Sequence, residues 1–221
     1  MSFEPVIQRA VTRHGSYEII KAAWPEPLSD QALGDLPDSF FLAQMTKRIF
    51  QAGFVWAVIE SKWKGFEAAF GGFDPLRFSV LPEESLRPMV NDKRIIRNWQ
   101  KIQTVKPNSD MIIAQSEKYG SFGKFLAQWP VNDIVSLWAF LKKNGARLGG
   151  NTGPMFLRFS GKDTFILSND VVQALIQEGV VTKQPTSVAD LKKVQDQFNQ
   201  WQAETGLHLC QLSKTLAMSV G

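Results

Sequence analysis

Apolar residues recur along most of this chain with the period of an α-helix. In residues 39–63 they fall three, four or seven positions apart, at Phe41, Met45, Ile49, Trp56 and Ile59. Most of the later segments repeat this spacing. The pattern therefore predicts a largely helical chain, with a helix running through residues 39–63.

Capping residues and prolines predict where several of these helices begin. Asp38 or Ser39 is placed to cap the helix that follows it. The Asp74-Pro75 and Leu81-Pro82 steps each put a proline where a first helical turn tolerates one. We therefore expect two further helices to begin at residues 75 and 82.

The later helices have equally clear limits in the sequence. Residues 92–105 form a basic amphipathic pattern, which Pro107 is expected to end or kink. Ser187 and Asp190 make a capping-box pattern, and Gly206 closes the helix that they open.

Strand signals are weak by comparison. The best is residues 163–168, a short β-branched and aromatic run without a partner. We therefore predict an all-α fold of the two-lobed kind, with about nine or ten helices. Residues 1–37 look irregular and are expected to pack as an arm on a helical domain at residues 38–221.

Composition narrows the chemistry. The chain has 221 residues and a net charge of +4, a mild positive bias that permits a polyanionic partner without requiring one. Its one cysteine, Cys210, excludes an internal disulfide, and together with His14 and His208 it cannot complete a closed zinc site. The N-terminal residues do not look like a signal peptide, and no apolar run is long enough for a membrane span. We expect a cytoplasmic protein, monomeric, without cofactor or metal.

The glycine-rich stretch at residues 148–154, between two helical patterns, has the composition of a phosphate-binding turn. Glycine permits close approach of the backbone, and amides at a helix start favour an anion. Candidate phosphate contacts are Gly149, Gly150, Thr152 and Gly153, with a second basic strip that includes Arg97 and Lys101. A plain helical hairpin capped by glycine, and a solvated basic face, explain the same residues without a ligand.

With the helix that follows it, this turn resembles the helix-hairpin-helix of DNA glycosylases. Gly150 stands where that pattern usually has proline, and Asn151-Thr152 lengthens it or shifts it by a residue. In that superfamily an aspartate follows after the next helix, and Asp170 lies at about that distance. The resemblance implies that Asp170 is the catalytic residue; an N-cap for the next helix is the alternative.

A longer stretch, residues 51–102, resembles the 3-methyladenine DNA glycosylase I family. The matching pieces are Gln51-Ala52-Gly53, Trp56, Phe73-Asp74-Pro75 and Ile95-Ile96-Arg97. The family carries a zinc clasp of two cysteines and two histidines, which this chain cannot build. Its base-contacting glutamate lies three residues before the glutamine-alanine-glycine step, where this chain has Arg48. The resemblance is therefore to a divergent branch without zinc.

The resemblance implies a base pocket lined by Trp56, Phe54, Gln51 and Arg48. Aromatic faces suit a base that has been flipped out of the helix stack, although Trp56 also fits a core position. Trp63 is a further candidate for stacking. Arg48 would repel a cationic base, so it either meets DNA phosphate, pairs with an acid such as Glu60, or indicates a neutral lesion.

Taken together, these features predict a DNA N-glycosylase of base-excision repair that acts on double-stranded DNA containing a damaged base. The resemblance points to an alkylated purine of the 3-methyladenine kind. A helix-hairpin-helix protein that binds damaged or bent duplex without catalysis is the first alternative. A helical protein–protein interaction module is the second.

Overall fold

The structure is a computed structural model that describes residues 2–221. Every regular element in this range is helical: there are fourteen α-helices and three 3-10 helices. The predicted all-α fold is confirmed, while the number of helices exceeds the expected nine or ten because turns divide several of the predicted ones. Across the described residues, no helix is both long and apolar enough to cross a bilayer.

The chain divides into two compact units. Unit 1 comprises the residues up to Leu28, Pro130–Leu137 and Gly161–Gly221, and unit 2 comprises Ser29–Trp129 and Trp138–Ser160. Unit 1 contains α1 (Glu4–His14), α2 (Tyr17–Ala22), η3 (Val131–Asp133), α12 (Asn169–Gln177), α13 (Val188–Thr205) and α14 (Leu209–Met218).

Unit 2 holds the remaining elements and the segment that carries most of the candidate site. These are α3 (Asp30–Gly34), α4 (Asp38–Gln51), α5 (Trp56–Ala69), η1 (Gly71–Phe73), α6 (Pro75–Val80), η2 (Glu83–Asn91), α7 (Trp99–Ile102), α8 (Val105–Tyr119), α9 (Phe122–Gln128) and α11 (Thr152–Phe159). The helix α10 (Ile134–Asn144) begins in unit 1 and continues into unit 2.

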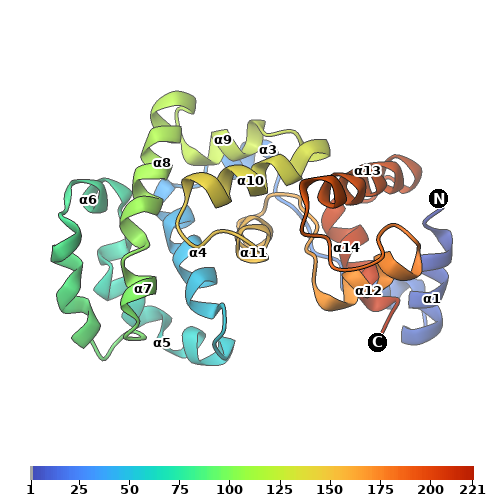
Figure 1. Ribbon diagram of the computed structural model, residues 1–221, viewed down its shortest axis with the longest axis horizontal. Coiled ribbons are helices and arrows are strands. Elements are labelled where there is room, and N and C mark those ends of the chain that lie inside the picture. Colours follow the sequence, from blue (N-terminus) through green and yellow to red (C-terminus); the bar gives the residue numbers. More distant parts are fainter. Residues whose placement is uncertain (1) are drawn as a thin grey trace. The chain divides into compact units, whose positions relative to one another are not determined.

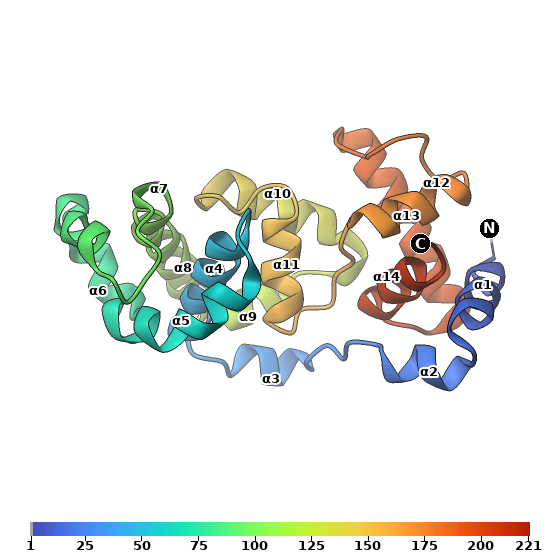
Figure 2. The ribbon, with the colours of Figure 1, turned by 90° about the horizontal axis from the view of Figure 1, so that it is seen from below.

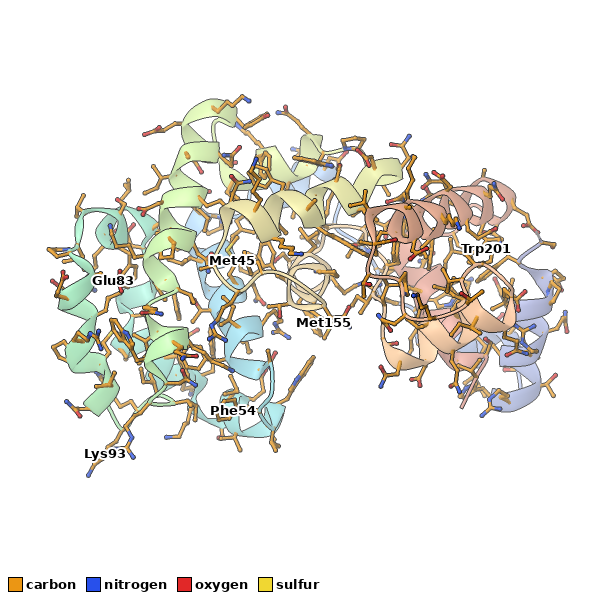
Figure 3. All side chains as sticks on the ribbon, viewed as in Figure 1. Met45, Phe54, Glu83, Lys93, Met155 and Trp201 are labelled. Atoms are coloured by element: carbon orange, nitrogen blue, oxygen red, sulfur yellow. The ribbon has the colours of Figure 1, made fainter. Side chains whose placement is uncertain are left out.

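Large aromatic rings fill the core of unit 1. Trp201 of α13 is fully buried and packs against Phe3 and Phe198, at ring-centroid distances of 5.1 and 5.6 Å (Figure 3). Phe165 stacks on Phe198 at 4.2 Å. The run at residues 163–168 therefore serves as a buried connection with no strand partner in the described chain.

Residues 2–37 contain three helices where irregular structure was expected. Glu4–His14 form α1, which packs against α14. Two short helices follow because serine side chains cap them: the Ser16 hydroxyl accepts a hydrogen bond from the Ile19 amide, and the Ser29 hydroxyl accepts one from the Ala32 amide. These two serines are the signal from which both helices could have been predicted.

The central element of unit 2 is α4, which lies between α8 and α11 in both views (Figure 1, Figure 2). Its apolar stripe is completely or almost completely buried, at Phe41, Leu42, Met45, Ile49 and Phe50. This confirms the helical period of the first half of residues 39–63. Burial on two sides fixes the position of the residues at the end of α4.

The second half of that stretch is a separate helix. The backbone leaves the helical conformation at Ala52, and Gly53 adopts a positive φ of 75° before α5 begins at Trp56. Neither Ser39 nor Asp38, the two expected caps, caps α4, and Asp38 is instead its first residue. Its carboxylate accepts hydrogen bonds from the Phe122 amide, at 2.9 Å, and from the Ser116 hydroxyl, which ties α4 to α9 and α8.

The basic helix expected at residues 92–105 is also wrong. The Asp92 carboxylate bonds the amide and the guanidinium of Arg94, which stabilises a turn instead of a helix. Asn98 then caps the short helix α7 by accepting from the Lys101 amide. Pro107 lies in the first turn of α8, where a missing amide costs nothing, so the proline neither ends nor kinks that helix.

Other predicted limits are confirmed. The Asp74 carboxylate accepts from the Leu76 amide and caps α6. The Ser187 hydroxyl accepts from the Asp190 amide at the start of α13, and Gly206 ends that helix in the left-handed conformation.

Asn108 of α8 holds the turn between α10 and α11 in place. This fully buried side chain accepts a hydrogen bond from the Ala146 amide, at 2.7 Å, and donates one to the Ala146 carbonyl, at 3.3 Å. One amide side chain therefore satisfies both backbone groups of a residue that has no helical partner.

We expect Asn108→Ala to destabilise the protein by about 2–3 kcal/mol, because both Ala146 groups lose their partner in a buried site. Urea denaturation measures this loss. Ser79→Ala, which removes an exposed hydroxyl on α6, is the control and should change the free energy of unfolding by less than about 0.5 kcal/mol. Equal stability of the two variants would contradict this role of Asn108.

Candidate functional site

The hairpin predicted at residues 148–154 is present as a helix–turn–helix between α10 and α11. Leu148 is buried beneath the turn, with 1% of its surface exposed. Arg147 and Gly150 both adopt the left-handed conformation, at φ of 57° and 58°. The turn therefore reverses the chain over few residues and brings the start of α11 to its outer edge.

Glycine is favoured at each of its positions in the hairpin for a different physical reason. A Cβ at Gly153 would lie 2.5 Å from the Leu148 carbonyl oxygen, so close backbone approach requires glycine there. At Gly150 nothing lies within 4 Å and only the positive φ favours glycine. At Gly149 a Cβ would lie 3.3 Å from the flexible Lys142 side chain. A bulky residue at Gly153 would thus disrupt the hairpin itself and says little about ligand binding.

Cationic side chains surround the turn. Lys142 and Lys143, in the last turn of α10, are exposed, as is Arg147. The Arg147 guanidinium donates to the Gln100 side-chain oxygen at 2.7 Å. Thr152, half-buried, is the first residue of α11. Positive side chains and a helix N-terminus therefore share this part of unit 2, an arrangement that suits an anion.

In the second basic strip, Lys93, Arg94 and Arg97 are exposed, whereas Lys101 is buried. Lys101 has 6% of its surface exposed, and its ammonium donates to the carbonyls of Phe50 and Ala52 at 3.2 and 2.6 Å. Burial, and then the nearby charge of Arg147, lowers the pKa of Lys101. Lys101 thus closes the C-terminal end of α4, a placement that does not favour contact with phosphate.

Three partly exposed aromatic side chains lie in, or packed against, the segment where α4 gives way to α5. Trp56 and Phe159 meet edge to face, with ring centroids 5.9 Å apart, and are 43% and 46% exposed. Phe54 is 40% exposed and projects from the turn between the two helices (Figure 3). We call Phe54, Trp56 and Phe159 the ring cluster. Trp56 is therefore not a core residue, which was the alternative from sequence.

Phe159 was not predicted from the sequence. It is the last residue of α11, beyond the hairpin, and only the tertiary packing of α11 on α4 brings it to Trp56. Trp63, by contrast, stacks between Phe66 and Phe73, with both ring centroids 5.5 Å away, and so belongs to the interior stacking of unit 2.

Arg48 lies beneath this cluster. Only 6% of the residue is exposed, and its guanidinium carbon is 4.0 Å from the Phe159 ring centroid and 5.5 Å from that of Trp56. Burial lowers the pKa of Arg48 to about 10, an effect that the charge of Glu60 opposes. The guanidinium is therefore still cationic at neutral pH.

Of the acids considered as partners for Arg48, Glu60 is engaged elsewhere. Its carboxylate lies 2.7 Å from the Lys47 ammonium and accepts from the Gln51 side-chain amide at 3.0 Å. The guanidinium of Arg48 instead reaches the Gln44 side-chain oxygen, at 3.5 Å. The positive charge of Arg48 beside the rings therefore has no direct ion pair within residues 2–221 and is offset only by the more distant charge of Glu60.

Asp170 is the second residue of α12 and is exposed. The cap of this helix is Ser168, whose hydroxyl accepts from the Val171 amide. The alternative of Asp170 as the N-cap is therefore wrong, and its carboxylate lies in the first turn, at the positive end of the helix. Asp170 belongs to unit 1, whereas the hairpin and the ring cluster belong to unit 2.

The residues that could bind a metal are scattered and engaged. Cys210 is buried with its sulfur 3.4 Å from the Pro25 carbonyl oxygen. His208 lies 3.5 Å from the Asp163 carboxylate, and His14 bonds the Met218 carbonyl. No group of three or more histidine, cysteine or acidic residues is arranged to hold a metal anywhere in residues 2–221. The zinc clasp of the family does not fit these residues.

Residues 35–144 match the family described as methyladenine glycosylase. This segment includes α4 through α10 and the ring-cluster residues Phe54 and Trp56, and it ends before the hairpin turn and Asp170. DNA-3-methyladenine glycosylase 1 of Escherichia coli (strain K12) is 30% identical over 76 residues, which is 34% of this chain and 41% of that protein. The match thus spans less than half of this curated relative.

Two kinds of solved structure share the fold. One is 3-methyladenine DNA glycosylase I of Staphylococcus aureus, with a TM-score of 0.51 at 22% identity over 62% of this chain and 80% of that one. The other is 8-oxoguanine DNA glycosylase of Methanocaldococcus jannaschii, with a TM-score of 0.52 at 15% identity over 95% of this chain and 91% of that one. The second match thus extends over nearly the whole chain.

We expect purified protein to contain no stoichiometric zinc, because the described residues offer no set of ligands for it. Elemental analysis after dialysis against a chelator and without it tests this expectation. The melting temperature should also be the same in both samples, since no structural metal is removed. One zinc per chain, or a lower melting temperature after chelation, would contradict it.

Proposed function

For this 3-methyladenine glycosylase I-like chain with the helix-hairpin-helix glycosylase fold, we propose the function of a DNA N-glycosylase in base-excision repair. Its substrate is double-stranded DNA with an alkylated purine, which is flipped out of the stack and hydrolysed from its sugar. The observation that carries the proposal is the exposed ring cluster. Two of its residues, Phe54 and Trp56, lie within residues 35–144, which match the methyladenine glycosylase family. Such rings provide the flat faces that an extrahelical base requires.

The chemistry breaks the bond between C1′ of the sugar and the base nitrogen. The bonding electron pair leaves with the base, and water adds to C1′. The proton that the water gives up passes to the departing base, or to solvent where that base was cationic. Positive charge develops on the sugar in the transition state, so a carboxylate nearby stabilises it or orients the water. Asp170 is our candidate, supported by its exposure and by its freedom from the capping role that Ser168 fills.

The hairpin is proposed to bind backbone phosphate. Support comes from the exposed Lys142 and Lys143 and from the start of α11 at the turn. Such contacts position a protein on duplex DNA without reading its sequence. The proposed phosphate contacts are Gly149, Gly150, Thr152 and Gly153. Glycine is required at position 153 in any case, because a Cβ there would lie 2.5 Å from the Leu148 carbonyl oxygen.

A base-release assay over a panel of alkylated and deaminated bases tests the enzymatic proposal directly. Release of an alkylated purine supports it. Binding to lesion duplex without release of any base would favour the non-catalytic alternative instead. Absence of salt-dependent duplex binding would favour the protein–protein module.

We expect Asp170→Asn to lower the rate of base release by about a hundredfold or more, because the group that stabilises the developing charge is lost. DNA affinity should be unchanged or slightly higher, since one negative charge is removed. The helix should remain stable because Ser168 provides its cap. Single-turnover kinetics and duplex titrations measure the two effects.

Asp196→Asn, the same change on an exposed residue of α13, is the control and should retain the wild-type rate. A rate within twofold of wild type for Asp170→Asn would exclude Asp170 as the catalytic residue.

The variant Trp56→Ala should lose both the rate of base release and the preference for the lesion, because a stacking face is removed.

Replacing Lys142 and Lys143 together with glutamine should weaken binding to all duplexes alike. The slope of log affinity against log salt should become shallower by about 0.9 for each phosphate that the two lysines neutralise. Lys192 and Lys193 form a second adjacent lysine pair, exposed on α13, and their double replacement is the matched control. An equal change of slope in the two double variants would argue against a phosphate-binding role of the hairpin.

A further inference from the structure

Each ring of the ring cluster already carries a cation of the protein. The Lys101 ammonium lies 4.5 Å from the Phe54 ring centroid, and the Arg48 guanidinium lies over both Trp56 and Phe159. A ring attracts a cation through the negative charge on its face. Once a buried cation occupies that interaction, a second cation at the same ring meets repulsion instead.

Two buried polar atoms in the last turn of α4 have no hydrogen-bond partner. They are the Nε donor of Arg48 and the Oε1 acceptor of Gln51. Both residues are more than nine-tenths buried, with 6% and 2% of their surfaces exposed. Because they are three positions apart on α4, their side chains leave the same face of the helix. An unpaired donor and an unpaired acceptor thus lie on neighbouring turns.

A ligand that provides the opposite pair would satisfy both atoms. The Arg48 donor requires an acceptor such as a carbonyl oxygen, and the Gln51 oxygen requires an N–H. A purine with a carbonyl group and an N–H or amino group presents this pair along one edge. The rings that cover Arg48 are more than two-fifths exposed, so their displacement uncovers the guanidinium without opening the core of unit 2.

We infer that the ring cluster, with Arg48 and Gln51 beneath it, selects an uncharged purine that carries a carbonyl oxygen, and rejects a purine that is cationic. This rests on the proposed function and names the substrate class of the same site. Purines alkylated at N3 or N7 are cationic in DNA, so the inference narrows the alkylated purines to those without that charge.

Four alkylated purines separate charge from the carbonyl. In DNA, 3-methyladenine is cationic without a carbonyl, 7-methylguanine is cationic with one, 1,N6-ethenoadenine is uncharged without one, and 1-methylguanine is uncharged with one. Each is placed in the same duplex on a 2′-fluoro sugar, which slows base loss, and equilibrium binding is measured. This readout does not depend on catalysis, so failure of base release leaves the test intact.

We expect the 1-methylguanine duplex to bind at least about tenfold more tightly than the 7-methylguanine duplex, because both bases carry the carbonyl and only 7-methylguanine brings a second cation to rings that Arg48 and Lys101 already occupy. In Arg48→Gln the two should differ by less than about threefold, and in Arg48→Glu the order should reverse. Arg87→Gln is the matched control. That guanidinium lies 4.1 Å from the Trp99 ring centroid, on an exposed residue outside the cluster, and its loss should leave the preference unchanged.

Tighter binding of either cationic base than of both uncharged bases to the wild-type protein would overturn the inference without any variant. So would an Arg48→Gln protein that is folded, by circular dichroism, and keeps the wild-type preference. Base release from a cationic purine alone would support the proposed glycosylase and refute the selection. Tighter binding of the uncharged purines without release of any base would support the proposed selectivity and refute the proposed glycosylase activity.

Discussion

The burial of α4 on two sides is the constraint on which unit 2 depends. Its apolar stripe packs between α8 and α11, and Asp38 at its first residue bonds both α8 and α9. At the other end, the Lys101 ammonium occupies carbonyls that the helix leaves unpaired. A helix fixed at both ends and on two faces holds Arg48 and Gln51 in place while the rings above them stay exposed to solvent.

This constraint also explains why charge and aromatic area are combined at one place. Phe54 and Trp56 follow α4 directly, and Phe159 arrives on the neighbouring α11. A cation that reaches these rings from inside the protein loses its hydration, so it interacts with them more strongly than an exposed one would. The affinity of the ring cluster for a ligand therefore depends on Arg48 and Lys101, which are almost completely buried in the free protein.

The sequence predicted the class of fold well and the local limits of helices unevenly. Asp74, Ser187 and Gly206 act on the backbone next to them, so their roles were visible in the sequence. The break after Gln51 was not, because Gly53 interrupts an apolar period that continues on both sides. Asp38 was predicted as a cap from its position, whereas tertiary partners far along the chain use its carboxylate.

The candidate site shows the same division. Trp56 and Arg48 lie close enough in the sequence for their proximity to be expected, and the resemblance supplied the rest. Phe159 is more than a hundred residues away from Trp56, and no periodicity connects them. Lys101 looked like a surface cation because its strip was predicted as a helix. The turn that Asp92 and Asn98 impose instead directs it inward.

Arg147 adopts a left-handed backbone conformation that glycine would adopt freely. An arginine in that conformation costs on the order of 1 kcal/mol relative to an unstrained residue. Gly145, Gly149 and Gly150 lie close by on either side, so this part of the chain readily accommodates glycine. A sequence optimised for stability alone would have a glycine at position 147 too. The arginine at this position instead places a positive charge beside the turn and donates a hydrogen bond to the Gln100 side-chain oxygen at 2.7 Å. A change of Arg147 to glycine would relieve the backbone and remove both of these features.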